Sequence, residues 1–172
     1  MRFIAFLLLL LLWACTAHAE IYTPFTVTGQ VVKNHDGDTI KLQTNDRGLL
    51  VIRFAASDTP ETGQAYWKVA RGVLRSQVDG KLVTVPCYKK DGRERDVCRV
   101  FVGSLDIGLE TVRRGVAWYA YHFGRELTES EQRDYQAAER LARELRLVLW
   151  ADLDPMPPWE CRKLRRAGQK CR

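Results

Sequence analysis

Carboxylates gather in three separated segments where a half-buried sheet would be expected to be apolar. The first carries Asp36 and Asp38, which stand two residues apart and can therefore face the same side of a strand entry. The second carries Asp58 and Glu61, and the third is the charged loop 91–96. Carboxylates with a nearby backbone carbonyl suit a hard cation that prefers oxygen ligands, such as Ca²⁺ or Mg²⁺.

Arginines in the same segments suit a phosphate ligand. Arg53 stands between Ile52 and Phe54 and should point away from their core face. A guanidinium is a flat fork that matches two phosphate oxygens at once. Only His35 and His122 follow the first nineteen residues, so a carboxylate rather than a histidine is the expected base. A metal, a carboxylate and arginines together describe the attack of water on a phosphodiester.

Five short strands should carry these residues. Alternating apolar residues and turn signals predict strands over 26–33, 38–44, 49–56, 82–87 and 97–102. Pro60 breaks the chain after the third strand and favours an extended Thr59. We expect an α+β fold that is mainly a five-stranded Greek-key barrel of the OB type, followed by C-terminal helices.

Three helices are expected around this barrel. One spans 65–77, with Val69, Val73 and Leu74 on its apolar side, and a shorter one spans 109–118. The sequence Thr-x-x-Glu at 128–131 is a capping box that begins a third helix. Its expected apolar face steps by three or four residues through Tyr135, Ala138, Ala142, Leu145 and Leu149.

The N-terminus has the pattern of a secretory signal. Arg2 precedes an apolar run over 3–13, and Ala17-His18-Ala19 is a small-x-small cleavage site. We expect cleavage between Ala19 and Glu20, which places the mature chain outside the cell or in the periplasm. The alternative is a lipoprotein whose N-terminus is a lipidated Cys15.

Cleavage after Ala19 leaves four cysteines. An even number in an exported chain suggests disulfides, and four cysteines allow three connectivities. We expect Cys87–Cys98 and Cys161–Cys171, because the members of each pair are close in sequence. A four-thiolate zinc site would be the alternative, but no Cys-x-x-Cys spacing supports it.

The distribution of charge separates a domain from a tail. The chain has 172 residues, of which 46% are hydrophobic and 28% charged, and a formal net charge of +6. We expect a leader over 1–19, one domain over 20–152 and a proline-containing basic tail over 153–172. The tail either follows a nucleic-acid backbone or is a solvated terminus with a small disulfide loop.

Several short motifs resemble the staphylococcal nuclease (thermonuclease) family in its exported bacterial form. They are DGDT at 36–39, IRF at 52–54, DTPE at 58–61, Arg95, and VRRGVAW at 112–118. The motifs occur in the order and spacing of that family, and the resemblance extends over about residues 26–150. It implies an OB-fold, calcium-dependent nuclease that acts on DNA and RNA and leaves 3′-phosphate ends.

The resemblance also assigns roles to individual residues. It implies that Asp38 and Asp58 bind Ca²⁺ through their side chains and Thr59 through its carbonyl. It makes Glu61 the general base or water-orienting group. It assigns Arg53 and Arg95 to the phosphate and Tyr121 to the nucleotide pocket. We expect a monomer that prefers single-stranded or denatured nucleic acid and has no obligate protein partner.

The third charged loop departs from the family pattern. Where the family has Asp-x-Tyr-Gly-Arg, this chain has Arg93 at the tyrosine position and Glu94 at the glycine position. Counting back from Gly115 makes Arg95 the phosphate arginine, but Arg93 takes that role if the loop shifts. Independently of such a shift, Glu94 could pair with Arg95 and make it less available. This departure keeps open a noncatalytic nucleic-acid-binding OB domain, while a lipid at Cys15 would favour a cell-envelope interaction protein.

Overall fold

The computed structural model describes residues 22–171. The expected leader, its cleavage site after Ala19, and Cys15 lie outside the described residues. Among residues 22–171, no helix is both long and apolar enough to cross a membrane.

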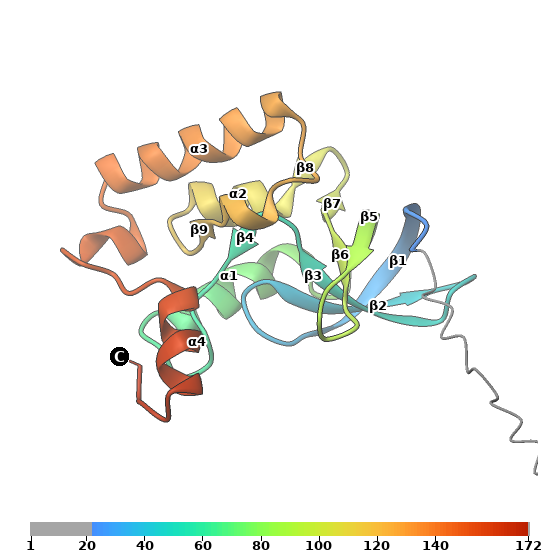
Figure 1. Cartoon of the computed structure of the whole chain (residues 1–172). Coiled ribbons are helices and arrows are strands. Elements are labelled where there is room, and N and C mark those ends of the chain that lie inside the picture. The colour runs from blue at the N-terminus through green and yellow to red at the C-terminus, as the bar shows by residue number, and fades with distance from the viewer. Residues whose placement is uncertain (1–21, 172) are drawn as a thin grey trace, which may run out of the picture.

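Five strands close into a barrel, as expected for an OB-type fold (Figure 1). Around the barrel they are β1 (Phe25–Asn34), β2 (Thr39–Thr44), β3 (Leu49–Phe54), β6 (Asp96–Cys98) and β5 (Leu82–Lys90). The barrel closes because β1 pairs with β5 as well as with β2. The β3–β6 pair is parallel, whereas the other four pairs are antiparallel. The expected Greek-key barrel is confirmed.

The barrel is filled by the inward-facing residues of its strands. Alternation along each strand sends one side chain inward and the next outward. The inward set is aliphatic and includes Val31, Ile40, Leu42, Ile52 and Val85, each at most 2% exposed. The removal of these aliphatic side chains from water is the main stabilising contribution to the barrel.

Four short strands extend the barrel and connect it to the helices. β7 (Phe101–Val102) and β8 (Leu105–Asp106) form a small hairpin beside β5. The expected strand 97–102 is therefore two strands, interrupted at residues 99 and 100. β4 (Ser57–Asp58) pairs with β9 (Trp118–Tyr119) in a separate two-stranded sheet.

Helix α1 (Trp67–Val78) packs against the barrel through Leu74 and Val78, which belong to the barrel core. The expected apolar face was partly wrong, because Val69 is 45% exposed. Ala70 takes the buried position instead, and it lies four residues before Leu74 on the same helical face.

Helix α2 (Ile107–Arg113) is shorter than expected. It ends before Gly115, whose φ of +69° lies in the left-handed region that favours glycine. The chain then turns back through residues 114–117, and Trp118, the expected last residue of this helix, begins β9 instead. This reversal brings β9 beside β4.

Helix α3 (Glu129–Glu144) crosses over α2 on the upper side of the view in Figure 1. The expected capping box is present: Thr128 accepts from the Glu131 amide, and the Glu131 carboxylate accepts from the Thr128 amide. Tyr135, Ala138 and Ala142 are buried as expected. Leu145 is 59% exposed, contrary to expectation, because the helix ends there.

The C-terminal segment contains a short 3₁₀ turn, η2 (Val148–Ala151), and a helix, α4 (Pro158–Arg166). Both expected disulfides are present, Cys87–Cys98 between β5 and β6 and Cys161–Cys171 at α4. Figure 1 shows α4 on the side of the molecule away from α3, next to the chain that leads into α1.

Gly115 provides a test of how the helices are attached to the barrel. A Cβ there would lie 2.6 Å from the backbone oxygen of Leu147, and φ is already +69°. We expect Gly115→Ala to lower the free energy of unfolding by about 2–4 kcal/mol, measured by urea denaturation. The control is Gly103→Ala, which has a φ of +60° but open space around its Cβ. It should cost only about 1–2 kcal/mol, and equal losses would contradict the steric argument.

Candidate active site

The turn before β2 is joined to the segment after β4 through Asp38. The Oδ2 atom of this buried carboxylate accepts hydrogen bonds from the Thr59 amide at 2.8 Å and the Thr59 hydroxyl at 2.9 Å. Gly37 permits the close approach, because a Cβ at this position would lie 2.6 Å from Thr59 Oγ1. Two of the sequence-predicted segments are thus brought into direct contact.

Arg53 lies between the two buried carboxylates. Ile52 and Phe54 point into the core, so strand alternation directs Arg53 to the opposite side. Its Nη1 atom lies 3.3 Å from Asp38 Oδ2, and Nη2 donates to Asp58 Oδ1 at 2.9 Å. Nη1 also donates to the backbone oxygens of residues 54 and 57. One guanidinium therefore fixes the relative position of both carboxylates.

Asp58 is positioned by the small β4–β9 sheet, in which it pairs with Trp118. Its side chain is only 1% exposed. Burial raises the pKa of this carboxyl group, although Arg53 and Arg162 act in the opposite direction. A buried carboxylate of this kind is stable as an anion only beside cations.

Negative charge is concentrated on the same side of the site by Asp36. Burial and the neighbouring Asp38 carboxylate raise the pKa of Asp36 to about 6. Burial would lower the pKa of the Arg53 guanidinium, but Asp38 and Asp58 outweigh this effect and raise it. The Arg53 guanidinium therefore stays charged. The three carboxyl groups around it, Asp36, Asp38 and Asp58, outnumber this one cation.

Glu61 lies at the edge of this cluster. Its amide donates to Gln64 Oε1 at 3.0 Å, and its side chain is 26% exposed. The carboxylate faces the same cavity as Asp38 and Asp58 and accepts from Arg162. Glu61 is thus accessible to solvent, whereas the two aspartates are not.

Arg95 reaches the site from the loop between β5 and β6. Its Nη1 atom donates to Thr39 Oγ1 at 3.1 Å, one residue from Asp38. Asp91 holds the other side of the guanidinium, with Nη2 at 2.7 Å and Nε at 2.8 Å from its Oδ2. Burial would raise the pKa of Asp91, but hydrogen bonds from Arg95 and Arg93 lower it.

The departures in this loop have a structural explanation. Glu94 occupies the family's glycine position and has a φ of +60°, so the left-handed backbone is kept without glycine. Arg95 pairs with Asp91 and not with Glu94, the partner that the sequence also allowed. Arg93 is exposed, and both it and Arg95 line the cavity.

A further arginine enters the site from the C-terminal helix. Arg162 on α4 donates to both oxygens of Asp58, at 3.1 and 2.8 Å, and to Glu61 Oε1 at 2.7 Å. Sequence reasoning missed this residue, because more than a hundred positions separate it from its partners. The only available signal was its place in a basic tail.

Tyr121 is not brought into the site. It is 62% exposed in the 3₁₀ turn η1 (Tyr121–Phe123), and its ring lies 3.7 Å from that of His122. It is not among the residues that line the cavity. Trp118, by contrast, is buried beneath the site, in edge-on contact with Trp150 and Trp159.

The other predicted site residues surround one cavity of about 620 Å³. Its walls combine carboxylates with cations, namely Asp36, Asp38, Asp58, Glu61, Asp91, Arg53, Lys89, Lys90, Arg93, Arg95, Arg162 and Arg166. The buried carboxylates lie on one side and the arginines of the β5–β6 loop on another. Such a cavity can take an anion with two free oxygens while keeping a cation beside it.

The donors suit a hard divalent cation. In residues 22–171, no group of three or more His, Cys, Asp and Glu side chains forms a metal site by itself. The candidate set is instead two carboxylates, Asp38 and Asp58, which both contact Arg53, and the nearby carbonyl of Thr59. An all-oxygen set of this size fits Ca²⁺ or Mg²⁺ when water and substrate oxygens complete the coordination.

Comparisons with known proteins agree with this geometry. The family model described as "Staphylococcal nuclease homologue" matches residues 51–152. An uncharacterized endonuclease of Escherichia coli O157:H7 is 31% identical over 77% of this chain and 83% of its own. A micrococcal nuclease of Shigella flexneri is 33% identical over 78% of this chain and 80% of its own. A staphylococcal-like nuclease of Arabidopsis thaliana is 33% identical over 68% of this chain but only 34% of its own.

Proposed function

The chain belongs to the staphylococcal nuclease family and is a nuclease, and we propose that it hydrolyses phosphodiester bonds in DNA and RNA with Ca²⁺, leaving 3′-phosphate ends. The observation that carries this proposal is the convergence of Asp38, Arg53, Asp58, Glu61 and Arg95 on one cavity. These residues come from three separate segments, and they supply metal ligands, a base and phosphate donors.

The metal site of the proposed enzyme consists of Asp38, Asp58 and the carbonyl of Thr59. A bound Ca²⁺ would supply positive charge to a phosphate oxygen as negative charge grows there. The buried carboxylates are preorganised for this task by hydrogen bonds from Arg53 and Thr59. Little side-chain conformational entropy is then lost when the metal binds.

Glu61 is the proposed general base. It accepts a proton from water as the water oxygen bonds to phosphorus and the bond to the 5′ oxygen breaks. The 5′ oxygen takes a proton from solvent water as it leaves, Glu61 returns its proton to solvent, and the phosphate stays on the 3′ side. Arg53 and Arg95 donate to the phosphate oxygens, whose negative charge increases in the transition state.

The proposed enzyme is a monomer that is exported and prefers single-stranded or denatured nucleic acid. The two disulfides support export, because such bonds persist mainly in oxidising compartments. An open single strand also exposes its phosphates to a cavity on one side of a small barrel.

Metal removal is the first test of the proposed function. The oxidised chain is incubated with denatured DNA in Ca²⁺ or in chelator, and fragment size and end chemistry are measured. We expect cleavage in Ca²⁺ that leaves 3′-phosphates and no cleavage in chelator, because without the cation the buried carboxylates repel a phosphate whose negative charge grows in the transition state. Binding without cleavage under any divalent metal would instead favour a noncatalytic nucleic-acid-binding domain.

Glu61→Gln tests the base. The amide keeps the shape of the side chain but cannot accept the proton, so turnover should fall by about 10²–10⁴-fold while nucleic-acid binding changes little. Single-turnover cleavage and equilibrium binding measure the two effects separately. Glu129→Gln is the matched control, because it neutralises a carboxylate that is 92% exposed and does not line the cavity. Parental turnover in Glu61→Gln would eliminate Glu61 as the base.

Arg95→Ala and Arg93→Ala, compared side by side, identify the phosphate arginine. Arg95 is held by Asp91 and Thr39, so its guanidinium is already oriented, whereas Arg93 is exposed. We therefore expect Arg95→Ala to lower kcat/KM by about 10²-fold or more and Arg93→Ala by less than about tenfold. Equal, mild losses would show that neither arginine is critical.

A further inference from the structure

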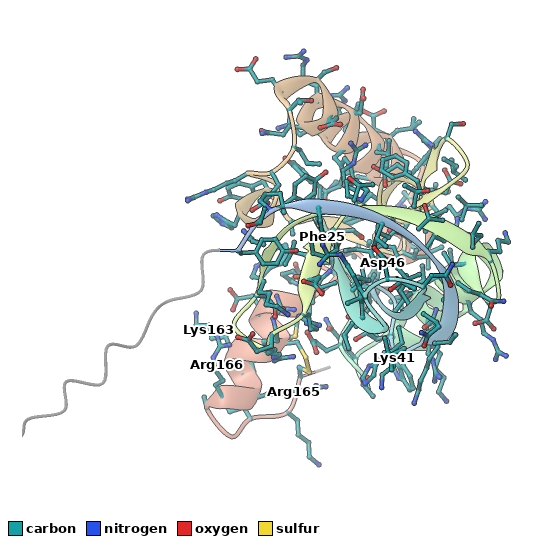
Figure 2. The ribbon with its side chains drawn as sticks, turned by 90° about the vertical axis from the view of Figure 1, so that its right-hand side faces the viewer. Phe25, Lys41, Asp46, Lys163, Arg165 and Arg166 are labelled. Carbon is teal, nitrogen blue, oxygen red and sulfur yellow. A yellow bond between two sulfur atoms is a disulfide. The ribbon has the colours of Figure 1, made fainter. Side chains whose placement is uncertain are left out.

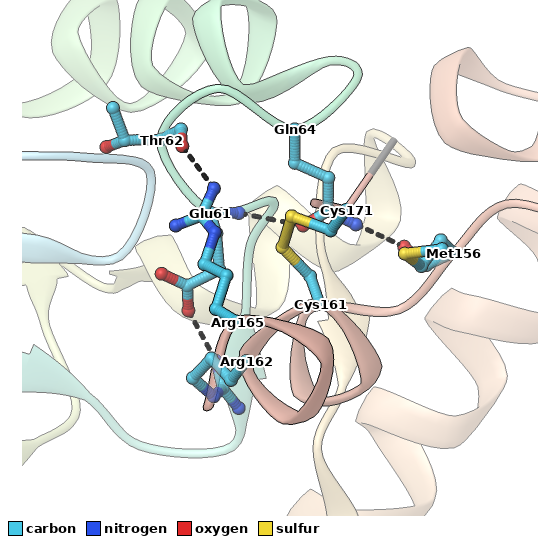
Figure 3. Close-up of a disulfide and its surroundings, with 8 residues drawn as sticks. All are labelled: Glu61, Thr62, Gln64, Met156, Cys161, Arg162, Arg165 and Cys171. Atoms are coloured by element: carbon cyan, nitrogen blue, oxygen red, sulfur yellow. Dashed lines mark hydrogen bonds and ion pairs between the residues drawn. A yellow bond between two sulfur atoms is a disulfide. The ribbon is translucent and has the colours of Figure 1, made fainter. Parts of the chain in front are cut away.

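Arg162 makes the most extensive ionic contact of the C-terminal helix with the site. Its two terminal nitrogens engage both oxygens of Asp58, and Nη1 also reaches Glu61. Figure 3 shows the Glu61–Arg162 pair beside the α4 disulfide. Burial would lower the pKa of this guanidinium, but Asp58 and Glu61 raise it, so it is fully charged. The helix therefore places a cation on the proposed metal ligand and the proposed base.

The helix is held firmly in the position that this contact requires. Arg165 donates to the backbone oxygen of Thr62 at 2.6 Å, and the Gln64 side chain donates to the Met156 carbonyl (Figure 3). Trp159 packs edge-on against Trp118. The Cys161–Cys171 disulfide closes the end of the chain back onto α4.

The contacts of Arg162 differ from those of its neighbours on the helix. Figure 2 shows Lys163, Arg165 and Arg166 on the same short helix, which is therefore basic on more than one side. Arg165 attaches the helix through a backbone carbonyl and makes no ion pair with Asp58 or Glu61. Arg165 thus anchors the tail without contacting the carboxylates of Asp58 and Glu61.

Asp58 cannot fully serve Arg162 and a divalent ion at once. Its Oδ1 atom already accepts from Arg53, and its Oδ2 atom accepts from Arg162 at 2.8 Å. A metal bound to Asp58 would occupy carboxylate lone pairs that now accept hydrogen bonds from the Arg162 guanidinium. The metal would also repel this guanidinium at close range. Because the Asp58 side chain is only 1% exposed, this repulsion is screened less than it would be at the surface.

We infer that Arg162 and the divalent metal compete for Asp58, which makes Arg162 a positioning residue of α4 that sets the metal affinity of the site. The inference rests on the proposed function for the identity of the metal ligands. Before metal binds, Arg162 neutralises Asp58 and holds Glu61. When metal binds, the guanidinium leaves Asp58 and Glu61 is released to accept a proton.

Calcium affinity of the purified, oxidised chain tests this competition without measuring catalysis. Calorimetric titration with Ca²⁺ should give a Kd for Arg162→Gln that is lower than the parental value by about tenfold or more. Arg162→Lys keeps the charge but loses the paired geometry, so it should fall between the two. Arg165→Ala is the matched control and should change the Kd by less than about twofold, since Arg165 contacts only a carbonyl.

Two results would overturn the inference. One is a Kd for Arg162→Gln equal to or higher than that of the parent, including no binding by either protein. The other is an equal gain in Arg165→Ala, which would show that loosening the tail, and not removing a competing cation, exposes the site. Cleavage assays run in parallel separate the two proposals: loss of nuclease activity in a parent whose calcium titration responds as expected contradicts the proposed function alone.

Discussion

The ion pairs of Arg53 with Asp38 and Asp58 are the interaction on which the site depends. They connect the turn before β2, the end of β3 and the short strand β4. Two buried carboxylates this close would repel each other strongly without a shared cation. The guanidinium also occupies two backbone carbonyls, which leaves it little freedom to move. The barrel supplies the rigid strand from which Arg53 projects.

The helical layer contributes by holding β9 against β4. Tyr135 of α3 donates to Asp106, which also accepts from Arg99 at 2.8 Å. Arg99 pairs in addition with Glu131, the residue that completes the α3 capping box. This buried network fixes α2 and α3 to the barrel, and the turn at Gly115 then returns the chain to β9. Asp58 is thus positioned by residues on both sides of the molecule.

The C-terminal helix changes the charge of the site more than its shape. Asp58, the most buried carboxylate of the described residues, acquires a cationic partner from a helix that begins only at residue 158. The same segment is tethered by a disulfide and by contacts to the loop after β4. Stability of the tail and the electrostatics of the cavity are therefore linked through one short helix.

The sequence by itself determined the barrel and most of the cavity, because these follow from local alternation, turn chemistry and short motifs. It only favoured the disulfide pairing, through the closeness of each pair in sequence, among three possible connectivities. Asp38, Arg53 and Asp58 were identifiable because each lies in a motif that spans a few residues. Only the tertiary structure decided what lies beside them. It exposed Tyr121 and paired Arg95 with Asp91 instead of Glu94. It also brought Arg162 to Asp58, and no local pattern encodes a contact between segments that meet only after the chain has folded.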